Sequence, residues 1–144
     1  MKNPLHTIEE YELFLYTLKE AFPMIKHSTM VLIRRGVTLA KSTGEIHFDQ
    51  GVRLVVRERI LFDRQPGIID WYGYEIWKDD KKLFWYDSQP HPGDSNLESS
   101  YPHHKHVPPN INRNRIPAPQ MSFTQPNLGV VIREIETLVE KEGK

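Results

Sequence analysis

The chain has 144 residues, with 19 basic and 19 acidic side chains, seven histidines and no cysteine. This length fits one domain over residues 1–144, and three Trp, six Tyr and six Phe suffice for a core. Zero net charge argues against a protein held to nucleic acid by bulk charge, and the lack of cysteine excludes disulfides and thiolate metal sites. The chain has no apolar run of the about 20 residues that cross a bilayer and no signal peptide, so we expect a cytoplasmic protein without membrane contact.

The N-terminal segment predicts an amphipathic helix. Thr7 and Glu10 have the S/T-x-x-E spacing of a capping box, in which each residue satisfies a free backbone N–H. Apolar residues then recur at three- and four-residue steps: Ile8, Tyr11, Leu15, Leu18 and Phe22. Because proline interrupts a helix, Pro23 should end this one near Ala21.

The next segments have the composition of β-strands. They span residues 30–40, 51–62, 68–77 and 82–87, and the turn signals between them are Ser42-Thr43-Gly44, Gln65-Pro66-Gly67 and the polar stretch 78–81. Short connections favour antiparallel pairing. We therefore expect a meander of three or four antiparallel strands.

Residues 89–126 differ sharply in composition, since they hold eight of the eleven prolines and four of the seven histidines. Such proline density predicts a long irregular loop, which in a compact domain is usually functional or disordered. An amphipathic helix over residues 127–142 follows. The expected fold class is α+β: an N-terminal helix, the meander, a long Pro/His-rich loop and a C-terminal helix.

The loop contains His103, His104 and His106, and His91 lies upstream of them. Imidazole titrates near neutral pH, so these residues are candidate general acids and bases, with Lys105 beside them to hold an anion. Two other interpretations stay open at this point. The histidines can be merely solvated, or His91, His104 and His106 can bind a divalent ion together with a carboxylate such as Asp87.

The segment Arg57-Glu58-Arg59 places a carboxylate among apolar strand residues. Strict alternation puts Glu58 on the core face, where a carboxylate is costly unless it is paired or hydrogen-bonded. One interpretation is a structural ion pair or a local bulge, and the other is a general base with a raised pKa. Arg57 and Arg59 point the other way and are candidates for phosphate binding.

Aromatic residues concentrate in residues 71–86. Most of them should pack in the core, because both faces of the two predicted strands carry aromatic side chains. Tyr74 and Tyr86 are candidates for stacking on a base.

These motifs, taken in order, resemble the TumE family of prokaryotic toxin–antitoxin proteins. The resemblance rests on Tyr72-Gly73-Tyr74-Glu75, on Lys82-Leu83-Phe84-Trp85-Tyr86-Asp87, on Pro90-His91 and on Tyr101-Pro102-His103-His104-Lys105-His106. It implies a toxin that a cognate antitoxin neutralises and that attacks RNA. The chain could also form a homo-oligomer.

The resulting hypothesis is a metal-independent endoribonuclease without a cofactor. Two of the loop histidines would act as acid and base, Asp87 would orient one of them, and Arg57, Arg59 and Lys105 would stabilise charge on the phosphate. A non-catalytic module that binds RNA or protein is one alternative. A metal-dependent nuclease with a His/Asp site is the other.

Overall fold

A computed structural model describes residues 3–143. Its helices are α1 (Ile8–Tyr16), α2 (Leu18–Ala21) and α3 (Leu128–Glu142), with short 3-10 turns η1 (Pro4–His6), η2 (Asp49–Gly51) and η3 (Ser95–Ser100). The strands are β1 (His27–Ser28), β2 (Val31–Arg35), β3 (Leu39–His47), β4 (Val52–Leu61), β5 (Ile68–Lys78), β6 (Lys81–Asp87), β7 (His104–His106) and β8 (Arg115–Pro117).

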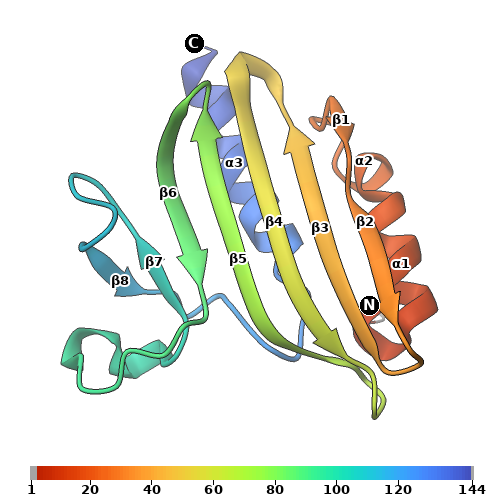
Figure 1. Cartoon of the computed structure of the whole chain (residues 1–144). Coiled ribbons are helices and arrows are strands. Elements are labelled where there is room, and N and C mark those ends of the chain that lie inside the picture. The colour runs from red at the N-terminus through yellow and green to blue at the C-terminus, as the bar shows by residue number, and fades with distance from the viewer. Residues whose placement is uncertain (1–2, 144) are drawn as a thin grey trace.

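Within the described residues, eight strands form one antiparallel sheet in the order β1-β3-β4-β5-β6-β7-β8, and β2 also pairs with β3 (Figure 1). The helices lie behind this sheet in Figure 1, with α3 across β4 to β6 and α1 beside β2. Their apolar residues and the inward residues of the central strands form the core. No described helix covers the opposite face, which bears Arg57, Trp71 and Asp87 and is called the open face below.

The expected meander of three or four strands is wrong, and two local features explain the difference. At the first, Ser42-Thr43-Gly44 does not break the chain but lies inside β3. A Cβ on Gly44 would lie 2.7 Å from the backbone of Met30, which is in the link between β1 and β2. Glycine therefore lets this link pass close to β3, with which both strands pair. The real turn lies at Gly36, whose φ of 71° suits glycine.

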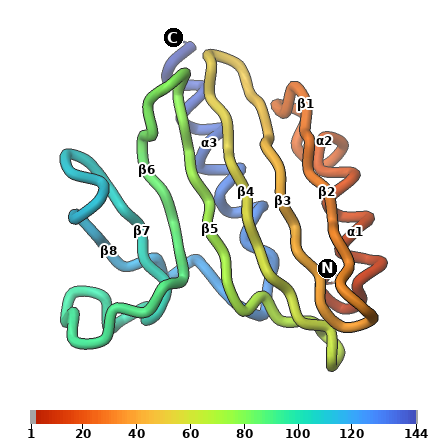
Figure 2. The backbone as a smooth tube through the Cα atoms, in the orientation of Figure 1, coloured from red at the N-terminus to blue at the C-terminus, as the bar shows by residue number. Residues whose placement is uncertain are grey.

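The second feature lies in the proline-rich segment, which is not wholly irregular. Its proline-free stretch His104–His106 forms β7, and Arg115–Pro117 forms β8. As the tube in Figure 2 shows, β7 meets β6 only near the end of that strand, where Trp85, Tyr86 and Asp87 pair with His106, Lys105 and His104. Three residues are too few for an alternating pattern to indicate a strand.

The N-terminal helix begins as predicted, because the Thr7 hydroxyl accepts a hydrogen bond from the Glu10 N–H at 3.1 Å. The predicted apolar stripe is buried. The helix is interrupted at Thr17, whose hydroxyl donates to the Leu13 carbonyl oxygen at 2.7 Å. Pro23 follows the end of α2, as expected. No described helix is long and apolar enough to span a membrane.

Glu58 is 2% exposed, and it lies on the helix-covered face, as strand alternation predicts. Three hydroxyl groups donate to its carboxylate: Tyr11 of α1 at 2.6 Å, Ser42 of β3 at 2.6 Å and Tyr74 of β5 at 2.5 Å. The amide of Asn127, the residue before α3, donates in turn to the Tyr74 hydroxyl oxygen at 3.1 Å. One buried carboxylate thus connects two helices to the centre of the sheet.

Removal of one of these donors should destabilise the fold. In Tyr11→Phe the Glu58 carboxylate loses one hydrogen bond without access to water, which should lower the free energy of unfolding by about 1–3 kcal/mol. Tyr101→Phe, at a tyrosine that is 49% exposed, is the matched control and should change it by less than about 0.5 kcal/mol. Urea denaturation measures both, and equal effects would contradict the assignment.

Glu58 should also make stability depend on pH. Burial raises the pKa of Glu58 above its ordinary range, and the hydrogen bonds from Ser42, Tyr11 and Tyr74 only partly offset this. Since the folded state holds the proton more tightly, the contribution of this group is largest below the unfolded pKa of about 4.3 and is lost as the pH rises through the folded pKa. Wild type should therefore lose stability relative to Glu58→Gln over that interval. A difference in the free energy of unfolding between wild type and Glu58→Gln that does not change with pH would disprove this role of Glu58.

Candidate functional site

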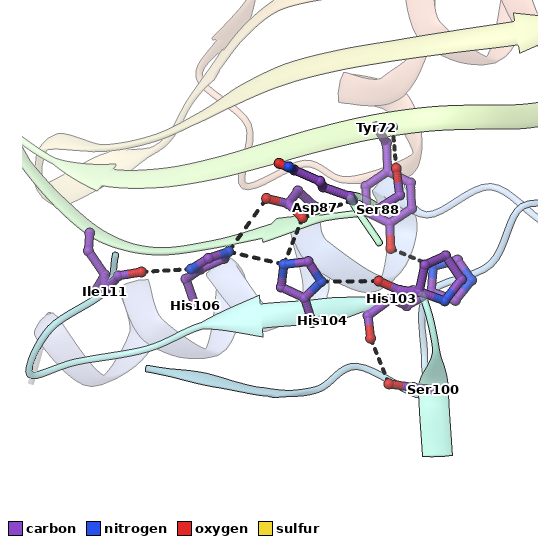
Figure 3. Close-up of polar contacts among 10 residues, drawn as sticks. Tyr72, Asp87, Ser88, Ser100, His103, His104, His106 and Ile111 are labelled. Atoms are coloured by element: carbon purple, nitrogen blue, oxygen red, sulfur yellow. Dashed lines mark hydrogen bonds and ion pairs between the residues drawn. The ribbon is translucent and has the colours of Figure 1, made fainter. Parts of the chain in front are cut away.

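Asp87, His104 and His106 meet on the open face and are called the Asp87 cluster here (Figure 3). Asp87 ends β6 and pairs with His104 of β7, while His106, two residues further, lies on the same side of the strand. His104 Nε2 lies 2.7 Å from Asp87 Oδ1, and His106 Nε2 lies 3.5 Å from Asp87 Oδ2. The two Nε2 atoms are 3.1 Å apart. The carboxylate and both imidazoles therefore face one point.

Backbone groups hold each ring in place. The Nδ1 atom of His104 lies 3.0 Å from the carbonyl oxygen of Pro102, and that of His106 lies 2.8 Å from the carbonyl oxygen of Ile111. A carbonyl oxygen only accepts, so each Nδ1 carries a hydrogen and donates it. Trp85 stacks on the His106 ring with centroids 3.7 Å apart, and the His91 ring meets that of His104 edge-on at 4.8 Å.

The three side chains of the cluster are buried, and Asp87 and His104 shift each other's pKa. Exposure is 7% for Asp87, 0% for His104 and 3% for His106. Burial favours the neutral form of Asp87, but the hydrogen bonds with His104 and His106 outweigh it and hold the pKa of that carboxyl well below its usual range. Burial likewise disfavours the charged form of His104, but the bonds to Asp87 and the Pro102 carbonyl outweigh it and raise the pKa of this imidazole. Asp87 is thus an anion at neutral pH.

A cavity of about 180 Å³ opens beside Asp87 on the open face. Gly73 forms its floor between Arg57 and Asp87 in the strand register, and the absence of a side chain there leaves the space. Trp71, which is 41% exposed, and Trp85 are aromatic walls. A second hollow of about 430 Å³ shares Arg57 and Trp71 with the first and extends to Lys41 and Arg59. Because they share Arg57 and Trp71, the two hollows form a groove across the strands, and it reaches the cluster at Asp87.

Two donors near the cluster have no acceptor among the described residues. They are the indole Nε1 of Trp85 and the guanidinium Nε of Arg115, both buried. Arg115 pairs with His106 in the β7–β8 register, and its positive charge acts on His91 and His104. Buried donors without partners are rare in folded proteins, and the oxygen atoms of an anion would satisfy them.

Of the predicted site residues, the structure brings Asp87, His104 and His106 together and places Arg57 at the groove beside them. Arg59 also reaches the open face, where its guanidinium binds both carboxylate oxygens of Asp70 at 2.8 and 3.0 Å. That ion pair reduces the capacity of Arg59 to hold a phosphate.

The other predicted residues lie elsewhere. Tyr74 is buried with Glu58 on the helix-covered face. Tyr86 and Lys105 both bind the Glu134 carboxylate of α3, at 2.6 Å each. His103 lies apart from the cluster, because its Nδ1 atom is 2.6 Å from the Tyr72 hydroxyl oxygen (Figure 3). Its ring also packs against that of Phe123. Their roles in binding or catalysis stay predictions without support from this arrangement.

The groove residues Trp71 and Gly73 had not been singled out as site residues. A glycine between two tyrosines in a strand is the one signal that pointed to Gly73, since a strand glycine often marks a close approach of a ligand. For Trp71 the sequence gives no distinction from a core aromatic residue, and only the sheet register places it on the open face.

Comparison with known proteins identifies the family. The family described as Toxin TumE matches residues 15–139, a range that includes the Asp87 cluster, the groove and all three helices in whole or in part. No curated protein and no protein of solved structure matches the chain significantly. This match over most of the chain confirms the resemblance seen in the order of its motifs. The protein belongs to the TumE family: it is the toxin of a toxin–antitoxin system, and its partner is a cognate antitoxin.

Proposed function

We propose that this toxin is an endoribonuclease that binds single-stranded RNA in the groove of the open face and cleaves it at the Asp87 cluster. The observation that carries the proposal is the position of the cluster at the end of a groove lined by Arg57, Trp71 and Trp85. Cationic and aromatic side chains along one groove are the usual means of binding single-stranded nucleic acid.

The groove residues suit the two chemical parts of RNA. The Arg57 side chain is 61% exposed. Its contact with Glu75 is 3.8 Å long, which is longer than a hydrogen bond, so its N–H donors stay available. It can therefore bind a phosphate, while the exposed ring of Trp71 can stack on a base. The free indole N–H of Trp85, which lines the groove, would lie toward the phosphate nearest the cluster.

The reaction would break the bond from phosphorus to the 5′-oxygen of one nucleotide. In the metal-independent form expected from the sequence, one imidazole of the cluster takes the proton of the ribose 2′-hydroxyl as that oxygen attacks phosphorus. The other imidazole protonates the leaving 5′-oxygen. The products are a 2′,3′-cyclic phosphate and a free 5′-hydroxyl. The metal-dependent alternative excludes this step, because the Nε2 atoms of both imidazoles would then bind the ion.

Growth inhibition tests the cluster directly. Induction of wild-type toxin without antitoxin should arrest the host, and the double variant His104→Ala, His106→Ala should not, because cleavage falls about 10²-fold or more when an acid or base group is removed. Cleavage of a labelled RNA by purified protein gives the same comparison in vitro, and circular dichroism shows whether the variant is folded. Undiminished growth inhibition by the double variant would rule the cluster out.

Surface variants test the groove without disturbing the buried cluster. Arg57→Ala should weaken the binding of single-stranded RNA and reduce the salt dependence, d log K/d log[salt], by about 0.7, as expected for the loss of one phosphate contact. Trp71→Ala should make the free energy of RNA binding less favourable by about 1–3 kcal/mol, because the stacking contact is lost. Arg133→Ala, which removes an exposed arginine of α3 on the other face, is the matched control for charge. Equal losses in all three variants would place the RNA elsewhere.

A further inference from the structure

We propose that Asp87 and the Nε2 atoms of His104 and His106 form a binding site for one divalent transition-metal ion. The site follows from the geometry of the cluster alone. Its use in RNA cleavage rests on the function proposed above. Zinc is the first candidate, because two imidazoles and a carboxylate without thiolate are a common ligand set for zinc.

The spacing of the ligand atoms fits an ion at their centre. His104 Nε2 lies 2.7 Å from Asp87 Oδ1, and His106 Nε2 lies 3.5 Å from the other carboxylate oxygen, Oδ2. The two Nε2 atoms are 3.1 Å apart, and with one ligand atom from each residue all separations stay within 4.8 Å. Ligands at about 2.0–2.1 Å from a zinc ion are about 2.9 Å apart at right angles and about 3.4 Å apart in a tetrahedron. The contacts of the cluster thus lie close to both values, and a small rotation of the Asp87 carboxylate would complete the ligand set.

The hydrogens on the rings point to the same conclusion. Each Nδ1 must donate to a backbone carbonyl, so each neutral ring presents the lone pair of Nε2. In that form the lone pairs of the two Nε2 atoms, which are 3.1 Å apart, face each other and the Asp87 carboxylate. Three acceptors directed at one point repel one another unless a cation lies between them.

The backbone contacts complete the arrangement expected of a metal site. A histidine that binds a metal through one ring nitrogen usually donates the N–H of the other to a carbonyl or carboxylate, which orients the ring. Pro102 and Ile111 supply these carbonyls here. Three protein ligands leave a coordination position open, and Asp87 borders the cavity through which water or a phosphate oxygen would reach it.

A proton is the competing occupant of this point. If His104 is an imidazolium, its Nε2–H donates to Asp87 and its Nδ1–H to Pro102, and the cluster is then a buried ion pair. The two occupants differ in a measurable way. A buried ion pair has no affinity for zinc that depends on His106, whereas a metal site loses its affinity when any one of the three ligands is removed.

The experiment uses the full chain, stripped with chelator and titrated with Zn²⁺ by calorimetry and with Co²⁺ by visible absorption. Wild type should bind one ion per chain, and X-ray absorption of the zinc form should show two imidazoles. Asp87→Asn and His106→Asn should each weaken binding by about 100-fold or more, since even residues that only orient a ligand cost 10–100-fold. X-ray absorption on wild type keeps the test valid if a variant does not fold.

The matched control is His27→Ala. His27 of β1 stacks on His47 with ring centroids 4.3 Å apart, so it belongs to a second pair of imidazoles remote from Asp87 in the strand order. Its removal should leave stoichiometry and affinity unchanged. Absence of one-to-one binding by wild type, or equal binding by wild type and both ligand variants, would overturn the metal site.

Two further outcomes separate this proposal from the proposed function. Cleavage of RNA by fully chelated protein that binds no zinc would uphold the endoribonuclease and overturn the metal site. Stoichiometric zinc that depends on Asp87 and His106, in a protein that cleaves no RNA, would uphold the metal site and overturn the endoribonuclease.

Discussion

A carboxylate at the centre of a sheet with no access to water must be hydrogen-bonded by the protein itself, and this requirement organises the fold around Glu58. Its donors come from three separate elements, through Tyr11, Ser42 and Tyr74. Asn127 extends the network to the start of α3. Because these hydroxyls all lie on one side of the sheet, the helices that carry or contact them are held on that side, and the other face stays open.

Successive side chains of β7 point to opposite faces of the sheet, so one of its three residues contacts the helix layer and the other two form the candidate site. Lys105 points toward the helices and, with Tyr86, binds Glu134 of α3. These contacts anchor the edge of the sheet to the helix layer. His104 and His106 on either side of it point the opposite way, toward Asp87. The ion pair of Lys105 therefore holds in register the strand on which the two imidazoles depend.

Local signals in the sequence identified the parts of the fold that have a clear period. The stripe of α1, the C-terminal helix, the strands over residues 51–87 and the inward direction of Glu58 all follow from spacings of two or of three to four residues. The number of strands did not follow, because β7 and β8 have only three residues each and Gly44 is an ordinary break signal used here for close packing. A period cannot be seen in three residues.

The candidate site was predictable in its composition and not in its arrangement. The histidine-rich segment and Asp87 are conspicuous in sequence, and alternation in an extended segment sets His104 and His106 apart from His103, which bonds to Tyr72. Nothing in the segment indicates that it pairs with β6 and so meets Asp87. Lys105 and Tyr86 looked like ligands for RNA because charge and aromaticity do not reveal which face a strand residue occupies.

Charge at the cluster links the two proposals. If both rings are neutral, the cluster carries only the negative charge of the Asp87 carboxylate, and in a buried site that charge would repel a phosphodiester. Arg57 and Arg115 nearby offset the repulsion only in part, since Arg57 is exposed to solvent and screened. A divalent ion changes the cluster from one negative to one positive charge. The ion proposed to remove the repulsion among the ligand atoms would also attract the phosphate, and it would let a chain of zero net charge bind RNA at one buried point.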